Sequence, residues 1–160
     1  MPSNSGNSGD SGNFGNPLVI VDPPREDVNA AALQWFAGRA QQLAGVRGQV
    51  DVLITDNRRL RELNRRFRHK SRPTDVLSFP RSNQSGGDIA ISAEMAAENA
   101  ARYSHAVGDE LKVLILHGML HLAGYDHERD NGEMAARESA LRARLRLPTA
   151  LIERSRKRLQ

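Results

Sequence analysis

The feature that most constrains the fold of this chain is a segment, from Leu111 to Leu122, that is apolar on nearly every face of a helix. A helix at the surface of a domain has one apolar stripe, whereas a helix that is apolar all round has to be enclosed on all sides. The segment is too short and too interrupted to cross a bilayer. It therefore predicts one central buried helix, with the rest of the chain packed around it.

The sequence on either side of this segment alternates between strand and helix patterns. Short apolar runs bounded by Pro, Gly or Asp predict strands, and apolar residues at intervals of three and four predict helices. The expected strands cover about residues 18–21, 50–55, 73–80 and 87–92, and the expected helices about 31–45, 56–67, 92–104, 109–123 and 130–145. This order predicts the α+β class, with a small mixed sheet and its helices packed around the central helix in a single domain.

The two ends of the chain differ in composition from its middle. Residues 1–16 are almost wholly Ser, Gly and Asn, which offer too little apolar surface to offset the entropy of ordering, so we expect a disordered extension. Residues 17–147 form the predicted domain, and residues 148–160 form a basic C-terminal segment. We find no pattern of a secretory signal and no run long enough to span a membrane, so we expect a cytoplasmic protein.

Three of the five histidines lie within the run HGMLHLAGYDH, at positions 117, 121 and 127. His117 and His121 are four residues apart, so on a helix both side chains lie on one face and can share an ion. Gly124 tolerates a positive φ, so the helix can end there and the chain can return His127 to the same point. Three imidazoles leave one tetrahedral position open, as in catalytic zinc sites. The chain has no cysteine, which excludes thiolate ligands and disulfides.

Two other interpretations of the histidine run have to be weighed. Each histidine alone is more often a hydrogen-bonded core residue than a ligand, but three at this spacing favour a metal site. The spacing also matches the metzincin protease signature, except that Gly118 stands where those proteases have their glutamate base. Met134 is compatible with a metzincin Met-turn, but its helical context indicates core packing instead.

The sequence resembles the YbeY family of bacterial endoribonucleases, the rRNA maturation factors, in three ordered segments, LNRRFRHKSRPTDVLSFP, GGDIAIS and HGMLHLAGYDH. The resemblance covers about residues 18–147 and implies no function for the segments on either side of that range. It implies a mixed four-stranded sheet, one Zn²⁺ per chain, cleavage of single-stranded RNA, and work in rRNA processing and ribosome quality control. It also implies that His117, His121 and His127 bind the zinc and that Arg68 is the functional arginine.

The strongest local charge bias lies between Arg58 and Arg72, a segment that contains eight Arg or Lys residues and a single acidic residue, Glu62. Guanidinium groups bind phosphate oxygens bidentately, so a surface of this kind can follow an RNA backbone without reading its sequence. The alternative is a solvated helix face. We assign Arg68, at the expected helix end, to phosphate binding and to stabilisation of transition-state charge.

Several points stay open at the level of sequence. The nucleophile is a zinc-activated water or the RNA 2′-hydroxyl, and the general base is unassigned. Asp126 has three possible roles, which are to orient a ligand, to act as a base or to cap the next turn. We expect Asn64, Ser78 and Asp88 to form hydrogen bonds to nearby backbone. The rival functions are a zinc metallopeptidase and a noncatalytic ribosome-assembly factor with a structural metal. The oligomeric state is not predicted.

Overall fold

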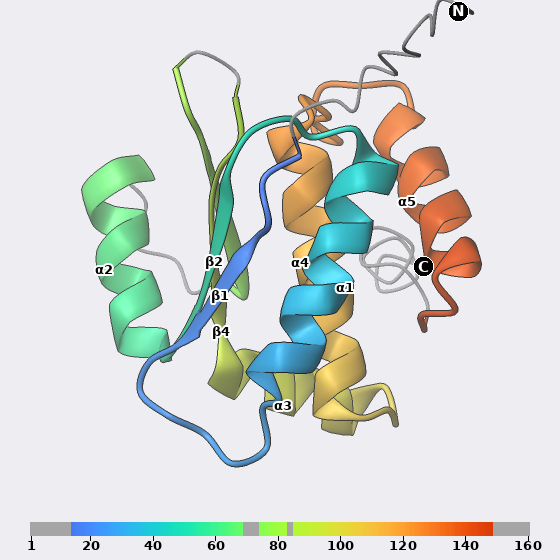
Figure 1. The fold of residues 1–160 in the computed structure, drawn as a ribbon. Helices are drawn as coiled ribbons and strands as arrows, with labels where there is room; N and C mark the ends of the chain where they lie inside the picture. The colour runs from blue at the N-terminus through green and yellow to red at the C-terminus, as the bar shows by residue number, and fades with distance from the viewer. Residues whose placement is uncertain (1–13, 69–73, 83–84, 149–160) are drawn as a thin grey trace, which may run out of the picture.

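The computed structural model describes residues 14–68, 74–82 and 85–148, with Arg68 described in its backbone alone. The elements in chain order are β1 (Leu18–Val21), α1 (Ala30–Ala44), β2 (Val50–Thr55), α2 (Asn57–Arg68), β3 (Val76–Pro80), β4 (Gly87–Ser92), α3 (Ala93–Arg102), α4 (Val107–Leu122) and α5 (Glu133–Arg144) (Figure 1). Each predicted strand and helix of the domain is present, with ends that differ by a few residues.

The described strands form one mixed sheet in the order β1-β2-β4-β3. β1, β2 and β4 run parallel, with Val52 paired to Val19 on one side and to Ile89 on the other. β3 is antiparallel to β4 and closes the far edge. The prediction of a small mixed four-stranded sheet in an α+β domain is therefore confirmed.

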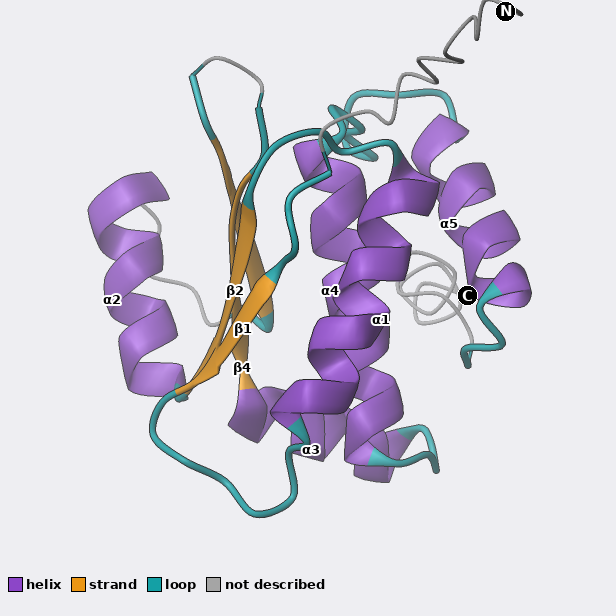
Figure 2. Ribbon diagram, viewed as in Figure 1, coloured by secondary structure: helices purple, strands orange, loops and turns teal. Residues whose placement is uncertain are grey.

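α4 is the buried centre of the molecule, as the apolar segment predicts. Figure 2 shows α1 and α4 against one face of the sheet, α5 beyond α4, and α2 alone on the opposite face. Buried residues occupy all sides of α4 because sheet, α1, α3 and α5 all contact it. Its fully buried apolar side chains, at 1% exposure or less, are Leu111, Val113, Leu114, Ile115, Leu116, Met119 and Leu120.

The helix ends follow from local side-chain chemistry. Asn29 accepts a hydrogen bond from the backbone N–H of Ala32 and begins α1, while Gly45, at φ 76°, ends it in the left-handed conformation. Asp56 accepts from the N–H of Arg59 at 2.8 Å and begins α2, as predicted. Ser92 caps α3 in the same way, through the N–H of Met95.

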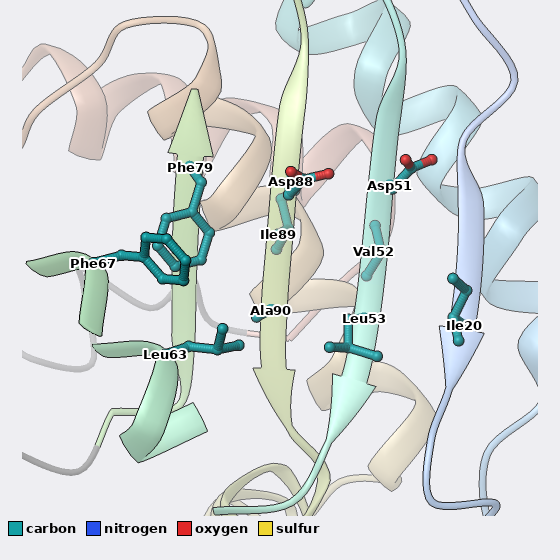
Figure 3. Close-up of a pocket in the computed structure, with 10 residues that line it drawn as sticks. All are labelled: Ile20, Asp51, Val52, Leu53, Leu63, Phe67, Phe79, Asp88, Ile89 and Ala90. Atoms are coloured by element: carbon teal, nitrogen blue, oxygen red, sulfur yellow. The ribbon is translucent and has the colours of Figure 1, made fainter. Parts of the chain in front are cut away.

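A groove of about 450 Å³ lies on the face of the sheet that carries α2. Leu63 and Phe67 of α2 form one wall, and Phe79 of β3 meets the Phe67 ring edge to face at 5.7 Å (Figure 3). Asp51 and Asp88 lie side by side on neighbouring strands at its rim. No histidine of the 117–127 run lines this groove.

The predicted terminal segments lie mostly outside the described residues, which begin at Phe14 and end at Pro148. Within the predicted extension, Phe14 forms an isolated bridge with Gly48, and the carbonyl of Asn16 accepts from Gln49. The assignment of residues 1–16 and 148–160 as separate segments stays a prediction. Among the described helices, none has the length and apolar character needed to cross a membrane.

Candidate metal centre

α4 places His117 and His121 one turn apart on the same face, near its C-terminal end. The two ring centroids are 4.7 Å apart. His117 is buried, with 5% of its surface exposed, and His121 is partly buried. The i, i+4 spacing therefore produces the shared face that the sequence predicts.

The third histidine arrives through a reversal of the chain just after α4. Gly124 has φ 100°, and the N–H of Tyr125 bonds back to the carbonyl of Leu120 at 3.1 Å, which closes the helix end. The following turn presents the exposed His127 with its ring 5.6 Å from each of the other two rings. One nitrogen from each histidine lies within 4.8 Å of the others, so the group can hold a metal ion.

The proton positions on His117 and His121 follow from the partners of their Nδ1 atoms. Nδ1 of His117 lies 3.1 Å from a carboxylate oxygen of Glu138, and Nδ1 of His121 lies 3.0 Å from the carbonyl oxygen of Tyr125. Both partners are acceptors, so each Nδ1 carries the hydrogen and each Nε2 presents a lone pair. The two Nε2 atoms are 3.1 Å apart and face one another.

The positions of these nitrogen atoms show whether a metal ion fits the site. Two lone pairs at that separation repel unless a cation or a proton lies between them. Two neutral imidazoles that converge with a third, each with Nδ1 available for a second contact, make up a donor set that suits Zn²⁺. The residues present therefore fit a zinc ion.

The electrostatic setting keeps His121 neutral at physiological pH. Burial, the largest cause, and the neighbouring imidazoles of His117 and His127 together lower its pKa from 6.5 to about 4, against the opposite effects of the carbonyl of Tyr125 and the carboxylate of Asp126. A neutral imidazole is the form that binds a metal, so His121 needs to release no proton at pH 7 to act as a ligand.

Glu138 is the residue of the site that sequence reasoning missed. It comes from α5 and is 0% exposed, on the same stripe of that helix as Met134 and Leu141. A signal was available, because Glu138 occupies a core-facing position, four residues after Met134 and three before Leu141. A charged residue on a buried stripe needs a partner.

Asp126 and Met134 have structural contacts in the described part of the chain. Asp126 accepts from the N–H of Glu128 through its side chain and from Arg129 and Asp130 through its carbonyl, which favours the cap among its three possible roles. Met134 is fully buried in the main core, as its helical context predicts.

Gly118 lies between the two helical ligands, where α4 approaches β4 too closely for a side chain. A Cβ at this position would lie 2.8 Å from Cγ2 of Ile89. The hydroxyl of Ser78 in β3 donates to the carbonyl of Gly118 at 3.1 Å. Ser78 therefore bonds to backbone, as expected, and this partner lies 40 positions away along the chain.

The other two polar residues of the matching motifs also have defined places. Asn64 is buried, with 4% exposed. Asp88 is exposed and lies 4.0 Å from the guanidinium of Arg81, which contacts Asp51 at the same distance. Arg81 thus partly neutralises the acidic rim of the groove.

The basic segment is a helix with its arginines on the outside. In α2, five arginines are exposed, and the guanidinium of Arg66 stacks over the ring of Phe67 at 5.6 Å. The five are Arg58, Arg59, Arg61, Arg65 and Arg66. α2 ends at Arg68, whose side chain, like Lys70 and Arg72, lies outside the described residues. The role assigned to Arg68 therefore stays a prediction.

Comparison with known proteins gives consistent matches over the folded part of the chain. A model of the family described as endoribonuclease YbeY matches residues 24–146, which include all three motif segments. The chain is 53% identical over 141 residues to endoribonuclease YbeY of Koribacter versatilis (strain Ellin345), covering 88% of this chain and 93% of that protein. It is 48% identical over 123 residues to endoribonuclease YbeY of Solibacter usitatus (strain Ellin6076), covering 77% and 84%. The solution structure of a Thermotoga maritima protein superimposes with a TM-score of 0.55 at 28% identity, covering 76% of this chain and 83% of that chain.

Proposed function

Because the chain belongs to the endoribonuclease YbeY family, we propose that it is a zinc-dependent endoribonuclease that cleaves single-stranded RNA in rRNA maturation and ribosome quality control. The observation that supports the zinc dependence is the approach of the Nε2 atoms of His117 and His121 to 3.1 Å, with a ring nitrogen of His127 within 4.8 Å of the other ligand atoms. We assign His117, His121 and His127 as the ligands of one Zn²⁺.

The ligand set leaves room for chemistry at the metal. Within the described part of the chain, these three residues form the one group placed to hold an ion, and a tetrahedral ion would keep its fourth position open. A zinc ion held there supplies Lewis-acid polarisation of a phosphodiester and activation of a water. Glu138 and the carbonyl of Tyr125 lie within hydrogen-bond distance of the Nδ1 atoms of His117 and His121, which leaves both Nε2 atoms for an ion.

The substrate side of the proposal rests on α2. Its exposed arginines can neutralise successive phosphates without reading bases, which suits a backbone of any sequence. Arg68, at the end of this helix, is assigned to the charge that grows on the phosphoryl oxygens in the transition state. Preference for single strands remains an inference from the family.

The metallopeptidase alternative loses support at Gly118. The glutamate base of such enzymes would have to stand at this position, where even a Cβ would collide with Ile89. The noncatalytic alternative requires a closed site, whereas the described residues contribute three ligands and not four. Neither alternative is favoured by an observation of its own.

A paired cleavage experiment tests the proposed function. The zinc-loaded protein is incubated with one RNA as a single strand and as a perfect duplex, and a chelator-treated sample and the His117→Ala variant are run in parallel. We expect endonucleolytic cleavage of the single strand by the zinc-loaded wild type alone. Equal cleavage after metal removal, or cleavage of a denatured protein in place of RNA, would contradict the proposal.

A further inference from the structure

We propose that Glu138 is a positioning residue, whose buried carboxylate fixes the tautomer of His117 and aims Nε2 of His117 at the shared metal position. The inference rests on the metal centre of the proposed function and adds a residue from a separate helix to it. It starts from one contact, the 3.1 Å approach of Glu138 Oε2 to Nδ1 of His117, in which both side chains are almost wholly enclosed, at 1% and 7% exposure.

Glu138 lies on a face of α5 that is otherwise apolar, so its buried carboxylate needs a physical explanation. The neighbours on the same stripe, Met134 and Leu141, belong to the main apolar core. Removing a carboxylate from water costs several kcal/mol unless it gains hydrogen bonds or an opposite charge. An apolar residue would fill this position without that cost, so the carboxylate is best explained by what it does to His117.

The three ligands differ in the support that they receive. His117 donates to a carboxylate, whereas His121 donates to a neutral backbone carbonyl, and His127 lies at the surface. A carboxylate partner raises the basicity of the imidazole and therefore strengthens its bond to a metal. His117 is accordingly expected to be the strongest ligand of the three.

In the metal-free protein, removal of the Glu138 carboxylate would allow His117 to adopt its other tautomer. Without an acceptor at Nδ1, the hydrogen of His117 can move to Nε2, where it would donate to Nε2 of His121 at 3.1 Å. That state places a proton where the metal should lie. Glu138 disfavours it by keeping the hydrogen on the opposite nitrogen.

The chain contains a matched control for this pair. Glu110, in α4, is also 0% exposed and also contacts a histidine, with Oε2 at 2.6 Å from Nε2 of His105. His105 is not part of the metal group. Glu110→Gln therefore removes a buried carboxylate from a histidine in the same core without touching the ligands.

The first test reads the tautomer directly. Long-range ¹H–¹⁵N NMR spectra of the metal-free protein distinguish Nδ1–H from Nε2–H imidazoles at pH 7.5. We expect Nδ1–H for His117 in the wild type and in Glu110→Gln, and Nε2–H in Glu138→Leu. Nε2–H for His117 in the wild type, or an unchanged tautomer in Glu138→Leu, would overturn the proposal.

The second test measures zinc affinity by competition with a chromophoric chelator. Glu138→Gln keeps the volume and removes the charge, so it should weaken zinc binding about 10–100-fold, as for other outer-shell partners of metal-bound histidines. Glu110→Gln should bind zinc as the wild type does. Equal affinity of Glu138→Gln and the wild type would overturn the proposal. A wild type that binds no zinc would instead refute the metal centre, and the tautomer would still decide whether Glu138 positions His117.

Discussion

Gly118 shows, at the scale of one residue, how tightly α4, the helix that carries His117 and His121, is packed against the sheet. Its Cα faces the stiff, β-branched side chain of Ile89, and its carbonyl accepts the hydroxyl of Ser78. We predict that Gly118→Ala lowers the free energy of unfolding by about 1–3 kcal/mol through overpacking, and lowers zinc occupancy because α4 must shift. Urea unfolding and elemental analysis measure the two effects.

Gly108 provides the control in the same helix. A Cβ there has no heavy atom within 4 Å, so Gly108→Ala should be neutral or slightly stabilising through its helix propensity. If both variants behaved alike, the close approach of α4 to β4 would not explain Gly118.

His121 gives a prediction for the pH dependence of the metal-free protein. Its pKa is about 4 in the folded state and 6.5 ordinarily, so between these values the unfolded chain binds a proton that the folded protein does not. The contribution of His121 to stability is therefore fully present above pH 6.5 and is lost as the pH falls toward 4. We expect His121→Gln to reduce the slope of unfolding free energy against pH in this window. An unchanged slope, measured by urea unfolding in chelator, would show that His121 is not desolvated.

Arg68 is predicted to act on chemistry and not on substrate affinity. Arg68→Ala should keep zinc content and fold, yet slow cleavage at saturating RNA by on the order of 10²-fold or more. Arg68→Lys should restore only part of the rate, because the ammonium keeps the charge and loses the planar fork. Arg58→Ala serves as the comparison and should mainly raise the RNA concentration required. A change in that concentration alone for Arg68→Ala would make it an ordinary binding residue.

The sequence predicts some of these residues and not others for physical reasons. The three histidines lie within eleven residues of one another, so helix periodicity and one glycine suffice to converge them. Glu138 reaches His117 only through the packing of α5 on α4, which no local pattern encodes. Ser78 likewise finds its partner across 40 residues, through the pairing of β3 with the sheet and the contact of β3 with α4.

At the scale of the element, α2 differs from the other described helices in lying alone on its face of the sheet (Figure 2). It also carries five exposed arginines. If it binds phosphates, affinity for single-stranded RNA should fall steeply as salt rises, through loss of counterion release. Reversal of Arg65 and Arg66 to Glu should flatten this salt dependence and leave zinc content unchanged. Fluorescence anisotropy with a labelled RNA at several salt concentrations provides the measurement.

The control for the α2 variant reverses two arginines on other helices, so that the net charge of the protein changes by the same amount. Arg102 and Arg144 are exposed in the last turns of α3 and α5, and their reversal to Glu alters net charge equally. This variant should keep most of the wild-type salt slope. Equal slopes for the two double variants would assign RNA affinity to net charge and remove α2 from the binding surface.

Element boundaries were predictable to within a few residues because capping signals mark them. Asp56 and Gly45 act at helix ends as their types indicate. The strand order β1-β2-β4-β3 was not predictable, since strands with similar apolar runs can pair in several orders and only the packing of α1 and α4 selects one.

At the scale of the whole molecule, the two faces of the sheet are used differently. One face packs against α4, which carries His117 and His121, so these two candidate ligands are held by a core helix, whereas His127 follows α4 and is exposed. The other face carries α2, a small separate core and the open groove. The candidate metal centre and the basic helix α2 thus belong to different faces of the sheet.

We propose that cleavage of RNA depends on one metal ion held by His117, His121 and His127. The most direct test measures the rate of single-stranded RNA cleavage as zinc is added to metal-free protein from zero to two equivalents. We expect a rate near zero without metal, a linear rise to one equivalent per chain and a plateau beyond it. Full activity in the metal-free protein, or a rate that zinc does not change, would contradict it.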